Sequence, residues 1–298
     1  MILVVEFGKD RERKALKGWR ERLLLWSSLV FQTHLGRRKI MFMVLAATLA
    51  FNICFFTLLH PWTIPNKDAD WQYFHYSNST GSRSLIAQYA GTGNEYMTLF
   101  QLSSRATHAY SRRHGLDVLE QRGIIFGSQP EHATYNKMGI LREACSQGYE
   151  KILLLDADAV IVDHDLDILA QLPNDMLFLG DKVVSNHGSH TWNVNIGITV
   201  WNCRHPLFDQ ITKRWKMIAS FWRFVRNSDQ IVLQMILISK MRQRRHIVLA
   251  RDDLFTGQAI AHFKRSDSHS WGDASKDRLE LVREAVDQVC RQNPFCED

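Results

Sequence analysis

A strand-like run that ends in two aspartates constrains the fold of this chain more than any other feature. Residues 151–162 read KILLLDADAVIV, an apolar run broken only by Asp156 and Asp158. An apolar run without alternation is typical of a strand that helices cover on both faces of a mostly parallel sheet. Because ionised aspartates are rarely buried there unpaired, both should lie where the strand leaves the sheet, held by a metal, a cation or backbone donors. In open α/β sheets the ligand crevice lies at this edge.

The rest of residues 84–298 alternates strand-like and helix-like segments. We expect strands at residues 84–90, 116–119, 176–179, 196–201 and 247–250, and helices at residues 94–114, 134–147, 208–222, 229–241 and 278–289. Apolar positions recur at helical spacing in the early helices, and Gly115 and Gly148 are typical of helix ends. The sequence therefore predicts an α/β domain in which a β-α-β unit precedes the aspartate-bearing strand.

An uncharged apolar segment, residues 40–59, precedes this domain. Its length matches the about 20 residues that a transmembrane helix needs, so we expect one membrane span. A signal peptide or a buried core helix is the alternative. The apolar core of a signal peptide is usually shorter and is followed by a small-residue cleavage site, whereas here the chain continues with His60-Pro61-Trp62.

The basic residues at the start of the chain predict its orientation. Residues 1–39 carry ten Lys or Arg and four acidic residues, which by the positive-inside rule places this tail in the cytosol. Residues 60–83 would then form a stem and residues 84–298 a luminal domain. The tail accounts for the whole net charge of +6, so the domain is balanced and no nucleic-acid-binding face is indicated.

Two further features agree with a luminal domain. Asn78 opens the only Asn-x-Ser/Thr triplet of the sequence, a candidate glycosylation site. Of the five cysteines, Cys54 lies in the expected span and the other four would meet an oxidising compartment. Cys290 and Cys296 are spaced to close a small loop, although spacing alone does not determine the pairing.

The pair Asp156 and Asp158 also points to a chemistry. Two carboxylates one residue apart at a strand end approach one divalent cation, which suits Mg²⁺ or Mn²⁺ carrying a diphosphate. Such a metal neutralises the charge that develops on a phosphate leaving group. A turn with two capping aspartates is the alternative without chemistry.

The order of the polar motifs resembles the nucleotide-sugar glycosyltransferases of the GT-A fold. It is most similar to glycosyltransferase family 34, the galactosyl-, mannosyl- and xylosyltransferases. The resemblance covers about residues 84–265 and rests on Lys137 in a helix, LLLDADAVI, Asn195-Ile196-Gly197, Ser228-Asp229-Gln230 and Ala261-His262-Phe263. It implies a Rossmann-type mixed sheet flanked by helices, and a Golgi enzyme of type II topology with a short cytosolic tail, one span and a stem.

The resemblance also implies roles for single residues. Asp156 and Asp158 would hold the metal and the donor, and His262 would be the third metal ligand. The other residues expected to contact the donor are Lys137, Asn195, Gly197 and Lys264. Lys264 stands where the family usually has a small-residue and cysteine sequence. This departure from the family pattern would place a cation near the diphosphate.

Asp229 and Gln230 match the family's acidic and amide pair beside the transferred sugar. The alternative is an ordinary helix start, with Ser228 as the N-cap and Asp229 in the first turn. The resemblance further implies Mn²⁺ or Mg²⁺ as cofactor, a nucleotide-diphosphate sugar as donor, and a glycan, glycoprotein or polysaccharide acceptor. It also implies retention of anomeric configuration, and association with itself or with other transferases is compatible with it.

Two other functions compete with this hypothesis. An apolar run followed by Asp-x-Asp also describes the nucleophile strand of haloacid-dehalogenase-type phosphatases, and Arg251-Asp252-Asp253 resembles their later metal motif. That nucleophile normally opens its domain, whereas here a β-α-β unit comes first. The lysine that such a phosphatase requires should also lie between the two aspartate motifs, whereas Lys137 precedes both. The second alternative is an inactive scaffold subunit of a glycosyltransferase complex, because fold does not imply function.

Overall fold

The computed structural model describes residues 43–52, 54, 71–78, 81–127, 130–182, 194–222, 229–239, 245–249, 254–255, 259–263 and 271–296. The chain divides into two units, residues 1–58 and residues 59–298. In the first unit, residues 43–52 and 54 are helical. Within the described ranges, no helix is both long and apolar enough to cross a membrane. The remainder of the expected span and the basic tail lie outside these ranges.

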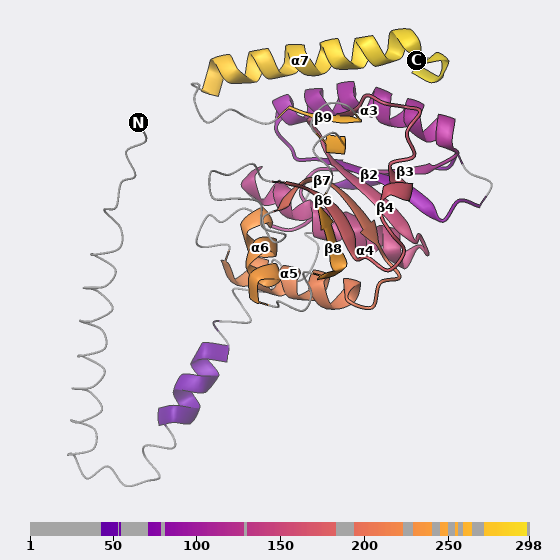
Figure 1. Cartoon of the computed structure of the whole chain (residues 1–298). Helices are drawn as coiled ribbons and strands as arrows, with labels where there is room; N and C mark the ends of the chain where they lie inside the picture. The colour runs from indigo at the N-terminus through magenta and orange to yellow at the C-terminus, as the bar shows by residue number, and fades with distance from the viewer. Residues whose placement is uncertain are drawn as a thin grey trace, which may run out of the picture. The chain divides into compact units, whose positions relative to one another are not determined.

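The second unit is an α/β domain (Figure 1). Its strands are β1 (Gln72–Tyr76), β2 (Ser84–Ala90), β3 (Asp117–Arg122), β4 (Lys151–Asp156), β5 (Ala159–Ile161), β6 (Phe178–Lys182), β7 (Val194–Asn202), β8 (Ile247–Leu249) and β9 (Ile260–His262). Its helices are α3 (Asn94–His114), α4 (Asn136–Ser146), α5 (Phe208–Trp222), α6 (Asp229–Ser239) and α7 (Trp271–Gln292), with short 3-10 turns that include η1 (Pro130–Tyr135) and η6 (Pro294–Cys296).

Seven of the strands form one mixed sheet in the order β1-β3-β2-β4-β7-β6-β8. The strands β3, β2 and β4 are parallel, whereas β7 runs antiparallel to both β4 and β6. The mixed sheet that the resemblance implied is therefore confirmed, and the mostly parallel sheet inferred from the apolar run describes only one half of it. A second, two-stranded sheet pairs β5 with β9, with Ala159 opposite His262.

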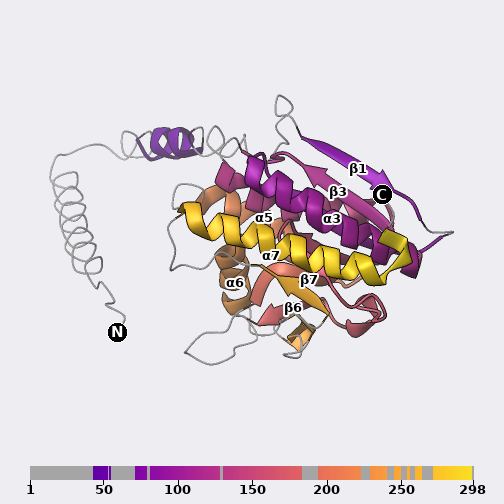
Figure 2. The ribbon, with the colours of Figure 1, turned by 90° about the horizontal axis from the view of Figure 1, so that it is seen from above.

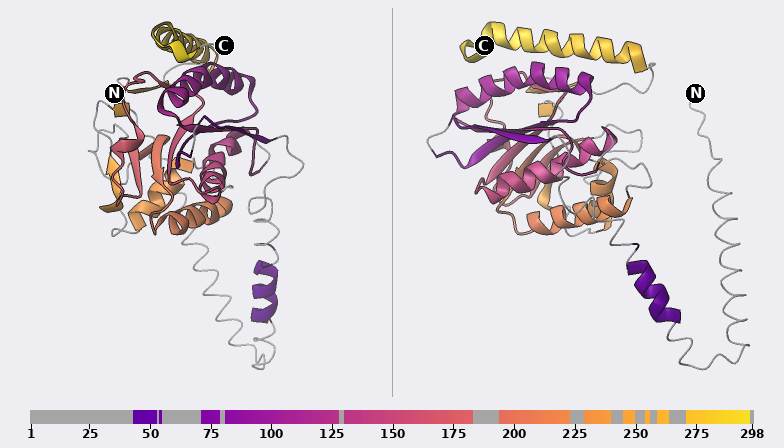
Figure 3. Two further views of the ribbon diagram at one scale, coloured as in Figure 1. Left: turned by 90° about the vertical axis from the view of Figure 1, so that its right-hand side faces the viewer. Right: turned by 180° about the vertical axis from the view of Figure 1, so that it is seen from behind.

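Helices cover the two faces of the large sheet. On one face α3 packs along α7, and on the other lie α4, α5 and α6, as Figures 1 and 3 show. The view in Figure 2 shows α7 running beside α3. The helices expected at residues 94–114 and 208–222 are confirmed, while α7 begins earlier than expected. Gly115 ends α3 with a φ of +61°, a left-handed conformation that glycine adopts without steric cost.

The range assigned to the stem, residues 60–83, also contributes to the sheet. Residues 72–76 form β1, which pairs antiparallel with β3 at the edge of the sheet. Because an edge strand is half exposed, β1 lacks the apolar run by which sequence reasoning finds a buried strand. The assignment of these five residues to an irregular stem is wrong.

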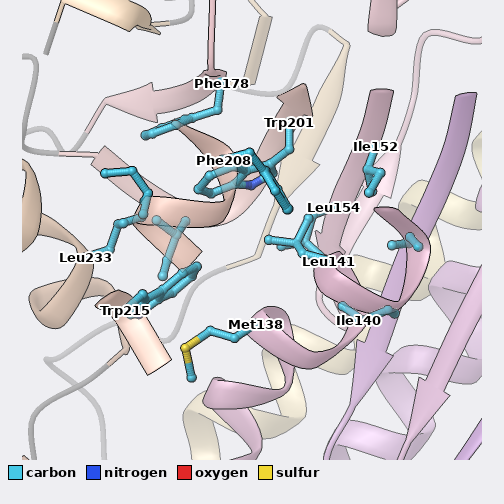
Figure 4. Packing of buried hydrophobic residues seen from close by; sticks show 14 of the residues in the cluster. Met138, Ile140, Leu141, Ile152, Leu154, Phe178, Trp201, Phe208, Trp215 and Leu233 are labelled. Atoms are coloured by element: carbon cyan, nitrogen blue, oxygen red, sulfur yellow. The ribbon is translucent and has the colours of Figure 1, made fainter. Parts of the chain in front are cut away.

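A large apolar cluster packs between the sheet and α4, α5 and α6, on the face that these helices cover (Figure 4). Trp201 of β7 stacks on Phe178 of β6, with ring centroids 4.5 Å apart, and on Trp215 of α5, at 6.2 Å. Burying side chains of this size stabilises the fold by about 2–3 kcal/mol each. The indole Nε1 of Trp215 donates to the backbone carbonyl of Asp229, at 3.0 Å. The core therefore holds the start of α6 in place.

Two disulfides close the domain further. Cys290 and Cys296 are bonded, which confirms the small loop that their spacing predicted. Cys145 at the end of α4 is bonded to Cys203 directly after β7, a pairing that the sequence did not indicate. Cys54 is exposed and takes part in neither disulfide.

The imidazole of His164 is buried against the C-terminal segment. Its Nε2 lies 3.2 Å from the carbonyl oxygen of Ile161, and its Nδ1 contacts the side-chain amide of Asn293. Because Asn293 Oδ1 already accepts from the Phe295 N–H, the amide presents its donor nitrogen to His164, which suits the neutral ring. Burial lowers the pKa of His164 to about 4.

Acid should therefore destabilise the domain through His164. An imidazole in the unfolded chain titrates near pH 6.5, whereas the folded one stays neutral down to about pH 4, so stability is lost as the pH falls through this window. Between pH 7 and pH 5 we expect the free energy of unfolding, measured by denaturant titration, to fall by about 1–2 kcal/mol more in the wild-type protein than in His164→Gln. Equal losses in the two proteins would contradict this assignment.

Candidate active site

The two aspartates lie at the end of β4, as the sequence predicted. Asp156 is the last residue of β4 and is directly opposite Tyr89 of β2, whose hydroxyl donates to Asp156 Oδ1. Asp158 is buried in the turn between β4 and β5. The backbone holds this turn, because Phe263 N donates to the Asp158 carbonyl at 3.0 Å and Ser103 Oγ donates to the Ala157 carbonyl at 2.8 Å.

His262 completes a cluster with the two aspartates. The pairing of β9 with β5 places its Nε2 at 3.3 Å from Asp158 Oδ1 and at 3.9 Å from Asp156 Oδ2. One ligand atom from each of the three residues lies within 4.8 Å of the others. Two carboxylate oxygens and one imidazole nitrogen are a donor set that Mn²⁺ and Mg²⁺ accept, so the residues fit the expected metal.

Burial raises the pKa of the Asp158 carboxyl, but two partners outweigh this effect. The hydrogen bond from His262 and the positive charge of Arg278 together lower the pKa below its ordinary value. The carboxylate is therefore in the ionised form that a metal ligand requires.

Lys137 connects three elements beneath the cluster. It projects from α4, is 3% exposed, and its Nζ lies 3.1 Å from Asp156 Oδ1 and 3.0 Å from Asp229 Oδ2. Burial lowers the pKa of Lys137, but the charges of Asp156 and Asp229 raise it above its ordinary value, so the amine is a cation. Lys137 is thus no solvated surface lysine. It joins the ends of β4 and α6.

Gly197 provides the space in which the cluster fits. A Cβ at this position would lie 2.2 Å from His262 Cε1 and 2.7 Å from Asp156 Oδ2. Asn195 Oδ1 accepts from Gly197 N at 3.0 Å, and its Nδ2 lies 3.2 Å from Asp181 Oδ2 and 3.4 Å from His262 Nδ1. Any side chain at position 197 would therefore displace the imidazole or the carboxylate.

The remaining candidates have separate places. Gln230 is half-buried beside Asp229 at the start of α6, and its Oε1 accepts from Ile196 N at 3.4 Å. Lys264 lies outside the described residues. Asn78 is not part of the cluster. It is exposed, and its Nδ2 donates to Ser111 Oγ at 3.0 Å.

Sequence reasoning missed Tyr89 and Arg278, which both contact the aspartates. Tyr89 is next to last in its strand, so an assumed parallel register between the first strand and the aspartate strand could have revealed it. For Arg278 no such signal exists, because one arginine at the start of a predicted helix is typical of a solvated face.

Comparison with known proteins relates this geometry to one class of fold. No protein family and no curated protein matches the sequence. A glycosyltransferase involved in the glycosylation of the major capsid of PBCV-1 is similar in structure, with 12% identity and a TM-score of 0.51 over 67% of this chain and 98% of the other. This likeness shows the fold and agrees with the GT-A architecture that the resemblance implied.

Two further glycosyltransferases of known structure are more distant. GlyE of Streptococcus pneumoniae TIGR4 has 14% identity and a TM-score of 0.45 over 71% of this chain and 64% of its own. The galactosyltransferase LgtC, solved with donor and acceptor sugar analogues, has 14% identity and a TM-score of 0.41 over 69% of this chain and 96% of its own.

Gly197→Ala should disrupt the cluster. The new methyl group cannot coexist with His262 and Asp156 in their present positions, so we expect Mn²⁺ affinity, measured by titration with electron paramagnetic resonance detection of free Mn²⁺, to fall about tenfold or more. Gly93→Ala is the control, because its Cβ would approach no atom closer than 3.9 Å and its φ is −73°. Unchanged affinity in Gly197→Ala would be inconsistent with the role given to this glycine.

Lys137→Met should destabilise the domain by about 3–5 kcal/mol, because it leaves the Asp156 and Asp229 carboxylates without their shared cation. Denaturant unfolding in the presence of a chelator measures this loss. The control is Lys213→Met, whose lysine forms an exposed pair with Asp209 and should change stability by no more than about 0.5 kcal/mol. A loss below about 1 kcal/mol in Lys137→Met would refute the buried ion pair as a stabilising element.

Proposed function

We propose that this protein is a metal-dependent glycosyltransferase that moves a hexose or pentose from a nucleotide-diphosphate sugar to a glycan acceptor. The observation that supports this most is the convergence of Asp156, Asp158 and His262 at the end of β4, in a domain whose fold is that of a glycosyltransferase. The end of a central strand is where α/β sheets bind ligands.

The metal would be held by Asp156, Asp158 and His262, and when bound it would neutralise the charge on the departing diphosphate. Lys137 keeps Asp156 oriented, because it holds Oδ1 of the carboxylate while Oδ2 faces His262. Gly197 keeps the edge free of side-chain atoms. These residues act by position and charge, which is the main contribution that a protein makes to transfer from a diphosphate.

Asp229 and Gln230 divide the role that the resemblance gives them. Asp229 is buried and bonded to Lys137, whereas Gln230 is only half-buried. We therefore assign Gln230 to the sugar and Asp229 to the positioning of Lys137. Asn195 would shape the sugar pocket together with Gly197, and Lys264 would contact the diphosphate. Retention of configuration, with the departing diphosphate accepting the acceptor's proton, remains part of the proposal.

We further propose that the domain is luminal in a Golgi membrane protein of type II topology. The basic tail and the uncharged segment 40–59 support this orientation. The two disulfides are typical of an oxidising compartment. In that compartment Asn78 is a candidate glycosylation site, and association with the same chain or with other transferases is compatible with this location.

The two competing functions make different predictions. In the phosphatase, the aspartate nucleophile would follow the first strand of the domain, whereas Asp156 ends β4, the fourth strand along the chain, and β4 has the antiparallel neighbour β7. Strand order therefore disfavours the phosphatase. An inactive scaffold would not require a complete metal-ligand set, so the intact cluster favours an enzyme.

The double variant Asp156→Asn, Asp158→Asn should lose at least about 100-fold in sugar transfer, because it removes the charge that holds the metal. The measurement is a panel of nucleotide sugars incubated with the full-length protein and Mn²⁺, with products detected by mass spectrometry. Asp209→Asn, an exposed aspartate in a surface pair, is the control and should remain active. Full activity of the double variant, or of the wild-type protein with a chelator, would refute the metal-dependent mechanism.

A further inference from the structure

Arg278 reaches the aspartate turn from the C-terminal helix α7. Its side chain is 4% exposed, and its Nη1 lies 3.3 Å from Asp158 Oδ2. Its Nη2 is hydrogen-bonded to the Glu95 carboxylate at the start of α3, and its guanidinium lies 5.1 Å above the ring of Tyr96. An arginine so fully buried is held by its partners, because an unpaired guanidinium would be costly to desolvate.

The two oxygens of Asp158 have different partners. Oδ2 is held by Arg278, while Oδ1 faces His262 Nε2 at 3.3 Å. Asp156 is arranged in the same way, since its Oδ1 is held by Lys137 and Tyr89 while its Oδ2 faces His262. Each carboxylate is thus bound on one side by a cation of the protein and presents its other oxygen to the cluster.

We propose that Arg278 is a positioning residue for the metal site: it holds Asp158 so that Oδ1 alone faces the metal. This inference rests on the proposed metal-dependent function and assigns a part of that site to the C-terminal helix. This role requires no contact of Arg278 with the metal or the donor. The arginine acts through Asp158, as outer hydrogen-bond partners do when they orient metal ligands.

The charges around the cluster agree with this role. In their ionised forms, Asp156, Asp158, Asp229 and Glu95 contact the two cations Lys137 and Arg278 and leave an excess of two negative charges. One divalent cation would neutralise this excess. Without Arg278, the buried Asp158 would lose the cation that holds its Oδ2 and would be free to rotate.

The C-terminal helix is anchored firmly enough to position a side chain. Val282 and Val286 of α7 pack against Leu99 and Ala106 of α3, and the two helices run side by side (Figure 2). At the far end, the disulfide between Cys290 and Cys296 closes the chain. A helix fixed in this way restricts Arg278 to one direction, which positioning requires.

A structural role alone is the competing explanation, because Arg278 also connects α7 to α3 through Glu95. If that were its only role, replacing Arg278 would lower thermal stability and leave metal binding unchanged. Mn²⁺ affinity separates the two explanations, since it reports the orientation of Asp158 and requires no knowledge of the donor or acceptor.

The experiment is titration of the full-length protein with Mn²⁺ alone, with free Mn²⁺ detected by electron paramagnetic resonance. We expect Arg278→Gln to bind Mn²⁺ about 10- to 100-fold more weakly than the wild-type protein. Arg278→Lys, which retains the charge without the planar fork, should recover part of the affinity. Arg283→Gln, on the exposed side of the same helix, should bind as the wild-type protein does.

A second variant covers the case in which Arg278→Gln does not fold. Glu95 is partly exposed, with 30% of its side chain accessible, so Glu95→Gln removes one anchor of Arg278 and should weaken Mn²⁺ binding several-fold with little change in melting temperature. Unchanged or tighter binding in a folded Arg278→Gln, or in Glu95→Gln if only that variant folds, would overturn the inference alone. A wild-type protein that binds no Mn²⁺ would overturn the proposed metal dependence, and the inference with it.

Discussion

The pairing of Asp156 with Lys137 is the contact on which the rest of the site depends. Removing charges of this kind from water costs several kcal/mol per ion, and the structure compensates because one ammonium group serves two carboxylates at 3.0 and 3.1 Å. Lys137, Asp156 and Asp229 come from α4, the end of β4 and the start of α6, respectively. A single buried cation therefore fixes the mutual position of three elements, and so the shape of the edge at which the cluster lies.

The mixed topology of the sheet explains how the cluster becomes compact. The strand β7 runs antiparallel beside β4, with Ile198 opposite Leu155. Gly197, the residue before Ile198, therefore lies against Asp156, the residue after Leu155. The small sheet of β5 and β9 then brings His262 back to the same edge. A glycine at this crossing allows close approach without strain, and the backbone rather than long flexible side chains sets the distances between the ligand atoms.

Much of this arrangement could be predicted from the sequence, because its signals are local or follow from strand ends. The apolar run predicted that Asp156 and Asp158 lie at a strand end, and the order of the motifs predicted that Lys137 and His262 lie near them. The missed features depend on contacts distant in sequence: the half-exposed edge strand β1, the disulfide from Cys145 to Cys203, and Arg278, which is 120 residues from its partner. Neither composition nor periodicity encodes such contacts.

The disulfide between Cys145 and Cys203 encloses more than it joins. The bond joins cysteines 58 positions apart, and the segment between them contains Asp156, Asp158, Asn195 and Gly197, so two of the three proposed metal ligands lie within one covalent loop. Closing a loop of this length removes conformational freedom from the unfolded chain that is worth about 4 kcal/mol. Where that bond is reduced, the segment that carries Asp156 and Asp158 would regain this freedom, although every residue of the cluster would still be present.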